Sequence, residues 1–394
     1  MSSTTKVWNF GAGPAAIPAE VLAKAQAEFL DFNNTGMSVL EISHRSKTFD
    51  NLLKKSKNDL RQLLNVPENY KILFMQGGGH TQFAAVVYNL VAAKRARMGD
   101  SSLNPPVDYV ITGSWSAKSV GEAKRLYANV NVAADARVSG GGKFGSIPPR
   151  EEWKLSGPDA AYVYYCDNET INGVEFPYIP DIDPSVPLVC DMSSNILSRK
   201  FDVSKFGVIY AGAQKNVGPA GVTIVIVRED LLVDQPKTVA EHSAESSSML
   251  MTVPSMLDYK IMADTDSLYN TPPVFAVYMA GLVFEHLVAR GGVQEIEKVN
   301  EKKAKLLYDY IDQSKIYQSH IDPKVRSRMN VPFRINPPEL EAQFLAGAEA
   351  LRMYQLKGHR SVGGLRASIY NAMTLEGVTA LIDYMKAFEK KHLA

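Results

Sequence analysis

Lys215 is the residue whose place in the chain most strongly suggests chemistry. It lies in GAQKNVGPAG (212–221), between the apolar runs FGVIYAGAQ (206–214) and GVTIVIVRE (221–229), which are typical of buried strands. Lysine is almost never fully buried without a partner, so an amine at the end of a buried strand needs a reason. A surface lysine in a turn is the simplest interpretation, and a site that uses the amine is the alternative.

Asp191 and Trp115 favour the second interpretation. Asp191 follows the apolar run in VPLVCDMSS (186–194), and Trp115 follows the apolar run VDYVITGS (107–114). Ligands of parallel sheets bind beyond the carboxyl ends of the strands, where these three side chains would meet. Pyridoxal phosphate needs an amine for a Schiff base, a carboxylate for its pyridine nitrogen and an aromatic ring for stacking. The set therefore predicts pyridoxal phosphate bound to Lys215.

A phosphate site is expected where three glycines separate a strand from a helix. The segment QGGGHTQFAAV (76–86) has this form. Backbone N–H groups at the start of a helix bind anions, and glycines let a ligand approach them closely. A plain tight turn is the alternative when the segment is considered alone.

Two His-Arg pairs predict a pocket for anionic substrates. They occur in EISHRS (41–46) and GHRSVGGLR (358–366), and the second segment adds a further arginine. Arginine binds carboxylates and phosphates through two parallel hydrogen bonds. Solvated surface is the alternative for any one of these side chains. The candidate residues are His44, Arg45, His359, Arg360 and Arg366.

The first two-thirds of the chain alternate between strand-like and helix-like segments. The pattern predicts an α/β domain with a mostly parallel sheet covered by helices. The expected strands are 70–77, 107–114, 160–170, 186–194, 206–214 and 221–229, and the expected helices are 80–96 and 116–128. The segment SAESSSMLM (243–251) is the expected mobile loop.

The character of the chain changes near residue 270, where a smaller α+β domain is expected. The large domain should span 16–270 and the small domain 271–394, with residues 1–15 packing against the small one. The expected helices are 269–292, 294–312, 338–354 and a closing helix, and the expected strands are 329–335 and 363–370.

Composition points to an ordinary globular protein. The chain has 394 residues, a net charge of +1, 45% hydrophobic and 22% charged residues, so no global field favours nucleic acid or a membrane. Cys166 and Cys190 lie in apolar runs and are expected to be buried, inert thiols in a reducing compartment. Neither a secretory signal nor an apolar run long enough to span a membrane is apparent. A cytoplasmic enzyme without a metal site is expected.

With these motifs assembled, the sequence closely resembles the phosphoserine aminotransferase family of the class V aminotransferase group. The resemblance covers essentially the whole chain and implies the aspartate aminotransferase fold (fold type I). GHRSVGGLRASIYN (358–371) is its most specific segment, and AGAQKN (211–216) marks the wider class V group. Further matching segments are NFGAGPA (9–15), EISHRS (41–46), FMQGGG (74–79), TGSW (112–115), NETINGVE (168–175) and YNTPP (269–273).

The resemblance implies cofactor roles for the matching residues. Lys215 becomes the Schiff-base lysine, Asp191 pairs with the pyridine nitrogen and Trp115 stacks on the ring. Thr170 and Gln214 make polar contacts to the cofactor. In a homodimer, Gly79 and His80 of one subunit bind the cofactor phosphate together with Asn270 and Thr271 of the other subunit; these four residues form the phosphate cup.

The same resemblance implies substrate roles and a reaction. His359 and Arg360 bind the phosphate of the substrate or the side-chain carboxylate of glutamate, and Arg366 binds the α-carboxylate. His44 and Arg45 assist from the partner subunit. The implied reaction moves an amino group between L-glutamate and 3-phosphohydroxypyruvate in a ping-pong sequence, giving 2-oxoglutarate and O-phospho-L-serine in L-serine biosynthesis.

Two positions depart from the family pattern. Many relatives have arginine where this chain has His80, which leaves the backbone N–H of His80 as its expected contribution. Some relatives have serine where this chain has Ala12, so no hydroxyl is available there.

Other functions are open to a chain of this kind. The nearest is another class V activity, such as alanine–glyoxylate transamination or cysteine desulfuration. A desulfurase needs a catalytic cysteine on a mobile loop, whereas both cysteines here lie in strand-like runs. Two His-Arg pairs favour a doubly anionic substrate over alanine. A non-catalytic binding protein is the remaining alternative, and Lys215, Asp191 and Trp115 argue against it.

Overall fold

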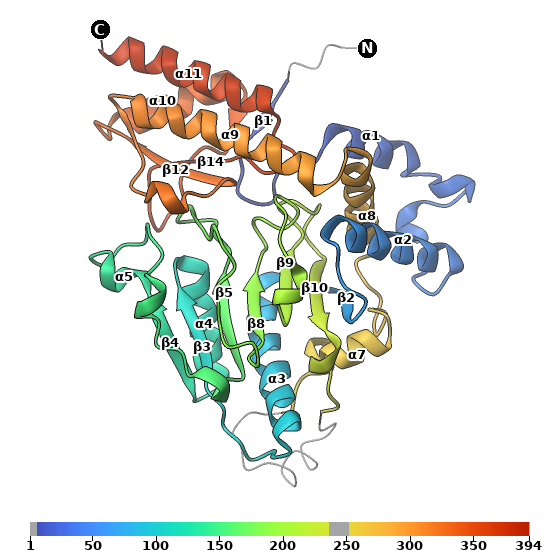
Figure 1. Cartoon of the computed structure of the whole chain (residues 1–394). Helices are drawn as coiled ribbons and strands as arrows, with labels where there is room; N and C mark the ends of the chain where they lie inside the picture. Colours follow the sequence, from blue (N-terminus) through green and yellow to red (C-terminus); the bar gives the residue numbers. More distant parts are fainter. Residues whose placement is uncertain (1–5, 236–251, 394) are drawn as a thin grey trace.

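A seven-stranded sheet forms the centre of the computed structural model, which describes residues 6–235 and 252–393 (Figure 1). In this sheet only β10 runs antiparallel to its neighbours, so the mostly parallel sheet predicted from sequence is confirmed. In spatial order the strands are β2 (Tyr70–Met75), β10 (Thr223–Arg228), β9 (Val208–Gly212), β8 (Leu188–Asp191), β5 (Tyr162–Cys166), β3 (Val107–Ile111) and β4 (Val130–Asp135).

Successive side chains of the strands pack into two different hydrophobic clusters. In β2, Ile72 and Phe74 belong to one cluster, and Leu73 and Met75 belong to the other. The first cluster includes side chains of α1 (Ala19–Glu28), α2 (Lys47–Leu64) and α8 (Val274–Ala289); the second includes side chains of α3 (Gly78–Met98), α4 (Ser114–Leu126) and α7 (Tyr259–Asp264). Burial on both faces explains why the strands read as continuous apolar runs.

Helix α2 shows how local sequence fixes one of these elements. The Ser46 hydroxyl accepts a hydrogen bond from the Phe49 N–H and caps the first turn. Phe49, Leu53 and Leu60 are buried at helical spacing, so one face of α2 packs inward. Asn65 ends the helix in the left-handed conformation, at φ 49°.

The C-terminal part of the chain forms a second lobe, above the sheet in Figure 1. Its hydrophobic cluster combines a three-stranded antiparallel sheet with helices. The elements are α9 (Val293–Gln313), β11 (Tyr317–Gln318), β12 (Asn330–Ile335), α10 (Leu340–Ala350), β14 (Leu365–Ser368) and α11 (Leu375–Leu393).

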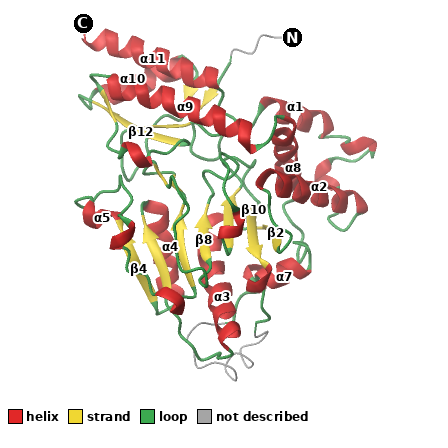
Figure 2. Cartoon of the chain, in the orientation of Figure 1, coloured by secondary structure: helices red, strands yellow, loops and turns green. Residues whose placement is uncertain are grey.

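Two short strand pairs join distant parts of the chain. β1 (Trp8–Asn9) pairs in parallel with β13 (Met353–Tyr354), which places the start of the described chain in the C-terminal lobe. β6 (Asn168–Glu169) and β7 (Val174–Glu175) form a hairpin, and Asn168 donates to Asn330 of β12 at 2.8 Å. Figure 2 shows that loops make up much of the region between the lobes.

Several element predictions need correction. The strand expected over 160–170 ends at Cys166, because the chain turns there into the β6–β7 hairpin. The elements not predicted from sequence include α1, α2, β4, the short α5 (Ala136–Ser139), α7 and β11. The helix expected over 338–354 ends at Ala350, and β13 follows it. The loop expected at 243–251 lies outside the described residues.

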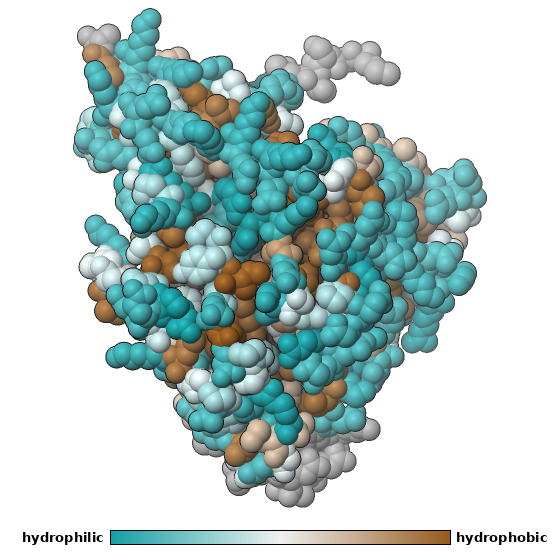
Figure 3. Space-filling model, in the orientation of Figure 1, coloured by the Kyte–Doolittle hydropathy of each residue, from teal (hydrophilic) through white to brown (hydrophobic). Residues whose placement is uncertain are grey.

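Surface and thiol chemistry agree with the composition. Hydrophilic side chains dominate the face in Figure 3, and hydrophobic ones gather near its middle. Cys166 and Cys190 are both buried free thiols, as predicted. Among the described residues no single helix is long and apolar enough to cross a membrane; α8 and α9 reach the required length and composition only as a pair bent by 88°.

Candidate active site

A cavity of about 240 Å³ collects most of the residues that the sequence singled out. Its lining combines the ends of the sheet strands with residues of the C-terminal lobe and Ala12 and Gly13 near the N-terminus. Nine predicted site residues line it: Gly79, His80, Trp115, Thr170, Asp191, Gln214, Lys215, His359 and Arg366.

Lys215 and Asp191 meet because their strands are parallel neighbours. In the register of β8 and β9, Asp191 stands opposite Tyr210, and Lys215 follows the end of β9. Both side chains are buried, at 9% and 5% exposure. The Lys215 Nζ donates a hydrogen bond of 2.7 Å to the Thr170 hydroxyl. The amine and the carboxylate thus lie at one edge of the sheet, as the sequence predicted.

Burial lowers the pKa of the Lys215 amine and so favours its neutral form. Desolvation lowers the pKa of Lys215 to about 8, although the Asp191 carboxylate acts in the opposite direction. The usual lysine pKa is about 10.4, so the neutral fraction at pH 7 rises to roughly a tenth. A neutral amine is a nucleophile and can accept a proton, which the ammonium form cannot do.

Asp191 is a buried carboxylate with few protein partners. Its Oδ1 accepts the Ser193 N–H at 2.8 Å. Burial raises the pKa of Asp191, while the Ser193 hydrogen bonds and the charge of Lys215 oppose this rise. Such a carboxylate is suited to pair with a protonated ring nitrogen, because that contact would replace the water it has lost.

Trp115 is held at the start of α4 by a buried carboxylate. Glu169 of the β6–β7 hairpin accepts the Trp115 N–H at 2.8 Å and the Ser116 N–H at 2.9 Å. The Lys215 Nζ lies 5.6 Å from the centroid of the Trp115 ring. Within the described chain, the buried Trp115 Nε1 has no hydrogen-bond partner. The ring therefore borders the cavity beside the amine, with one polar atom left for another partner.

The glycine segment forms the expected helix start. Gly77 adopts φ 95° and α3 begins at Gly78, two residues before the predicted start. The first N–H groups of a helix lack intrahelical acceptors, so this turn can bind an anion. A Cβ atom built on Gly79 would lie 3.7 Å from the Asp191 Oδ2, which places this turn against Asp191.

His80 and the C-terminal lobe add aromatic and cationic groups. The His80 ring meets the Trp115 ring edge to face, with centroids 5.6 Å apart. The Arg366 Nη1 donates to the Thr170 carbonyl oxygen at 3.4 Å. Burial lowers the pKa of His359, and the nearby charges of Arg366, Lys118 and Arg360 lower it further. These three neighbouring positive charges favour an anionic ligand.

Five predicted residues do not line this cavity. Asn270 lies near the glycine segment, where its Oδ1 accepts a hydrogen bond from the Gln76 Nε2 at 3.1 Å. Arg360 is exposed beside His359. The five residues are His44, Arg45, Asn270, Thr271 and Arg360.

Sequence reasoning missed several polar residues of the site. Ser193, Ser194 and Asn168 line the cavity, and the Ser193 hydroxyl accepts the Gly212 N–H at 3.0 Å. Glu169 was quoted only as part of NETINGVE, without a role. The available signal was its proximity to Thr170, but only the folded hairpin brings it to Trp115.

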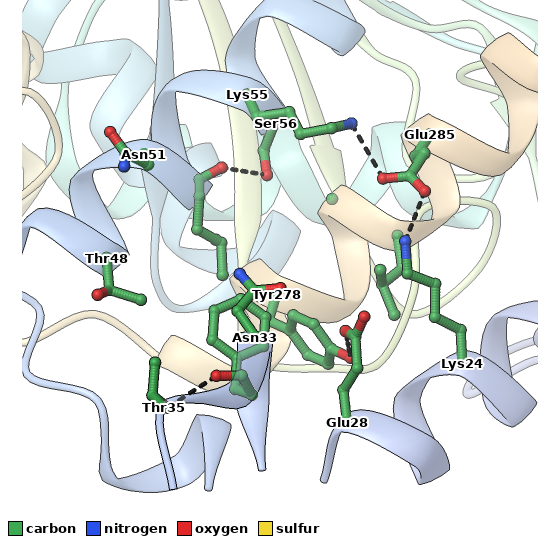
Figure 4. Close-up of a pocket in the computed structure, with 14 residues that line it drawn as sticks. Lys24, Glu28, Asn33, Thr35, Thr48, Asn51, Lys55, Ser56, Tyr278 and Glu285 are labelled. Carbon is green, nitrogen blue, oxygen red and sulfur yellow. Dashed lines mark hydrogen bonds and ion pairs between the residues drawn. The ribbon is translucent and has the colours of Figure 1, made fainter. Parts of the chain in front are cut away.

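A second cavity, of about 380 Å³, lies between α1, α2 and α8 (Figure 4). Its charged groups already have partners: Glu285 pairs with both Lys24 and Lys55, and the Tyr278 hydroxyl donates to Glu28 at 2.6 Å. None of the fourteen predicted site residues lines it. The smaller cavity around Lys215 is therefore the candidate active site.

Comparisons with known proteins identify the family of the chain. The family model of the class V aminotransferases matches residues 7–381. A phosphoserine aminotransferase from Nitrosomonas europaea is 51% identical over 98% of this chain and 99% of its own length. The phosphoserine aminotransferase of Bacillus circulans subsp. alkalophilus superposes with a TM-score of 0.87 at 44% identity, covering 98% of this chain and 99% of its own.

A structure with bound cofactor is similar as well. The phosphoserine aminotransferase of Trichomonas vaginalis, solved with pyridoxal phosphate, superposes with a TM-score of 0.85 at 40% identity and covers 97% of this chain and 100% of its own. The family, the fold and the arrangement around Lys215 lead to one conclusion: the chain belongs to the class V aminotransferase family, in its phosphoserine aminotransferase branch.

Proposed function

We propose that the chain transfers the amino group between L-glutamate and 3-phosphohydroxypyruvate, giving 2-oxoglutarate and O-phospho-L-serine in L-serine biosynthesis. The observation that carries this proposal is the shared cavity of Lys215, Asp191, His359 and Arg366, in a chain 51% identical to a phosphoserine aminotransferase. A buried amine beside an arginine and a histidine, both hydrogen-bond donors to anions, suits substrates that combine an amino or keto group with two anionic ends.

The residues present fit pyridoxal phosphate, one per subunit, attached to Lys215. When bound, this cofactor supplies an aldehyde for amines and an electron-withdrawing ring. Asp191 would hold the proton of the ring nitrogen, Trp115 would cover the ring, and Thr170 and Gln214 would make polar contacts. The turn at Gly79 and His80 would bind the phosphate. The cavity between these groups and the unpartnered Nε1 of Trp115 support the fit.

We assign the proton transfer at the reacting carbon to Lys215. Its amine is buried and its pKa is lowered to about 8, so it can take a proton from the substrate Cα and return it. The Thr170 hydroxyl orients this amine through the 2.7 Å hydrogen bond. Burial of the amine also keeps bulk water away from the carbon that gains and loses the proton.

The cationic residues select the substrate. We assign Arg366 to the α-carboxylate, and His359 with Arg360 to the distal carboxylate or phosphate. One cluster can serve both substrates, because each distal group is an anion. Alanine has no distal anion, which favours this proposal over alanine–glyoxylate transamination.

Cysteine desulfuration is disfavoured by the thiols themselves. Cys166 lines the cavity but is buried, and burial together with the charge of Glu169 raises its pKa well above the usual range. A thiol in that state is a poor nucleophile. Cys190 is buried with its pKa raised in the same way.

We further propose a homodimer that shares its active sites. His44, Arg45, Asn270 and Thr271 stand outside the cavity of their own chain, next to segments with exposed apolar side chains. Those side chains are Leu30, Met37, Leu40 and Tyr269, with exposures of 78%, 46%, 54% and 49%. Exposed large apolar side chains next to four residues that need a partner support an interaction surface here. In the dimer, His44 and Arg45 would bind substrate and Asn270 and Thr271 would complete the phosphate cup of the other subunit.

Location and domain division complete the proposal. We place the enzyme in the cytoplasm, which suits two free, buried thiols. We divide the chain into a large cofactor-binding domain at 16–270 and a small domain at 271–394. Helix α8 falls in the second range, but its side chains pack into the hydrophobic cluster of the large domain. The segment 1–15 goes with the small domain, in line with the pairing of β1 and β13.

A half-reaction screen tests the function. Purified holoenzyme is mixed separately with O-phosphoserine, glutamate, alanine and cysteine, and the visible absorbance of the cofactor is followed. O-Phosphoserine and glutamate should convert the spectrum at low concentration, and alanine and cysteine should not. Conversion by alanine alone would overturn the substrate assignment while leaving the aminotransferase chemistry in place.

A further inference from the structure

Lys303 is a fully buried lysine outside the cavity of the candidate active site. It lies on α9 in the C-terminal lobe and its side chain is 0% exposed. Its Nζ donates to three backbone carbonyl oxygens: Ile369 at 2.9 Å, Tyr370 at 2.8 Å and Met373 at 2.9 Å. An ammonium has three N–H donors, and here each has one acceptor. Burial lowers the pKa of this amine to about 7.

The three acceptors belong to one segment, Ile369–Met373, which directly follows β14. Since Arg366 lies within β14, the segment and the candidate carboxylate-binding residue are parts of one short stretch of chain. The Ile369 N–H also donates to the Met329 carbonyl oxygen at 2.8 Å, which continues the pairing with the β12 side of the small sheet.

The same segment contacts the cavity from two further directions. The Tyr370 hydroxyl donates to the carbonyl oxygen of Ala12, a cavity-lining residue, at 2.9 Å. The Asn371 N–H donates to the side chain of Asn216, the residue after Lys215, at 3.0 Å. The segment thus lies between α9 on one side and, on the other, the catalytic loop, which is the stretch 213–222 between β9 and β10 that carries Lys215.

We propose that Lys303 is a positioning residue of the substrate site, whose side-chain amine holds Ile369–Met373 against the catalytic loop through these hydrogen bonds and thereby sets the place of Arg366 relative to Lys215. The inference rests on the proposed function, because it uses Arg366 as a ligand for the substrate carboxylate. Lys303 does not line the cavity, and its three hydrogen bonds all go to the segment, so it would act on Arg366 through the segment.

Replacement of Lys303 by methionine tests the idea. Methionine has a similar length but cannot donate to the three carbonyls. In holoenzyme we expect KM for glutamate to rise at least tenfold and kcat to change less than threefold. The visible cofactor spectrum should stay unchanged, because Lys215, Asp191 and Trp115 belong to the other lobe. The dissociation constant of glutarate, an unreactive dicarboxylate, should rise by the same factor as KM.

A double-mutant cycle separates positioning from a general loss of stability. If Lys303 acts through Arg366, Lys303→Met should weaken glutarate binding less than twofold once Arg366 is alanine. An equal factor in both backgrounds would overturn the proposal. Lys94→Met is the matched control: Lys94 is also buried, at 8% exposure, and donates to the Pro158 carbonyl oxygen at 2.5 Å, but far along α3 from its first turn. It should leave KM unchanged.

A second variant covers the case in which Lys303→Met does not fold. Tyr370→Phe removes the hydroxyl that donates to the Ala12 carbonyl oxygen and accepts a hydrogen bond from the Asn330 Nδ2 at 3.0 Å. It should raise the glutarate dissociation constant, and this effect should disappear when Arg366 is alanine. A folded Tyr370→Phe enzyme with wild-type binding would contradict the proposal. Wild-type enzyme that binds glutarate but transfers no amino group would overturn the proposed function alone, and wild-type enzyme that fails to bind glutarate would overturn both.

Discussion

Lys215 combines three properties that a surface lysine lacks. It is buried, it is hydrogen-bonded to Thr170, and burial lowers its pKa to about 8. The Asp191 carboxylate limits this shift, since an opposite charge favours the ammonium. The amine is therefore partly neutral near physiological pH, and its hydrogen bond to Thr170 fixes its orientation.

Lys215→Ala should abolish the chemistry. The variant can no longer bind the cofactor covalently or carry the Cα proton, so we expect turnover to fall by roughly 1,000-fold or more. The visible absorbance of bound cofactor should change at the same time. Steady-state kinetics and absorbance spectra make the measurement, and Lys94→Met serves as the control. Normal turnover in Lys215→Ala would remove the basis of the mechanism.

Covalent attachment of cofactor should depend on pH in a defined way. Only the neutral amine attacks an aldehyde, and the neutral fraction of a group with a pKa of about 8 grows about tenfold per pH unit below that value. The attachment rate of pyridoxal phosphate to apoenzyme should therefore rise from pH 6 and level off above about pH 8. Stopped-flow absorbance measures it. A rate still rising tenfold per unit at pH 9.5 would mean that the amine is not perturbed.

At the scale of elements, the site depends on how strands end and helices begin. Asp191 ends β8, and Lys215 follows the end of β9. Helices α3 and α4 begin at the same edge of the sheet, at Gly78 and Ser114. Glu169, which belongs to the β6–β7 hairpin and not to α4, caps the N-terminus of α4 by accepting two of its backbone N–H groups. A carboxylate at a helix N-terminus satisfies free N–H groups and interacts favourably with the helix dipole.

Glu169→Ala should destabilise the protein and disturb Trp115. The carboxylate accepts two N–H groups and the Ser116 hydroxyl, and hydrogen bonds to charged groups contribute about 1.5 to 3 kcal/mol. We expect the free energy of unfolding to fall by about 3 kcal/mol in urea denaturation. Glu122→Ala, elsewhere on α4, is the matched control and should stay within about 0.5 kcal/mol of wild type. Equal stabilities for the two variants would contradict the capping role.

At the scale of the whole molecule, the β6–β7 hairpin joins the two lobes. Glu175 of β7 accepts hydrogen bonds from Arg328 of the C-terminal lobe at 2.8 Å and 2.9 Å, and Asn168 bonds Asn330. Thr170 lies in the turn of the same hairpin, in contact with Lys215. The lobes therefore meet through the segment that orients the amine.

Shared active sites predict complementation between inactive variants. Lys215→Ala and Arg45→Ala chains, refolded together, should regain about a quarter of the wild-type activity, because half of the dimers are mixed and each has one intact site. Light scattering should give a mass twice the 43.3 kDa of one chain. If Arg45 served its own subunit, no mixed dimer would have an intact site and no activity would return.

The sequence by itself determined the chemistry and the class of fold. Lys215, Asp191, Trp115 and the glycines before α3 could be found because each follows an apolar run, and the ends of parallel strands must share one edge. The basic residues were found by type and motif, and His359 and Arg366 do reach the cavity. Local patterns carry this information because strand ends are set by nearby residues.

Only the tertiary structure decided how distant segments support these residues. Three contacts join segments that are far apart in the sequence, and no hydrophobic pattern in the sequence predicts them. They are Glu169 with Trp115, Lys303 with Ile369–Met373, and Asn330 with Asn168. Polar groups such as these look like ordinary solvated residues in a sequence. Their partners are fixed by packing of the two lobes, because a buried polar group must find a hydrogen bond wherever the fold provides one.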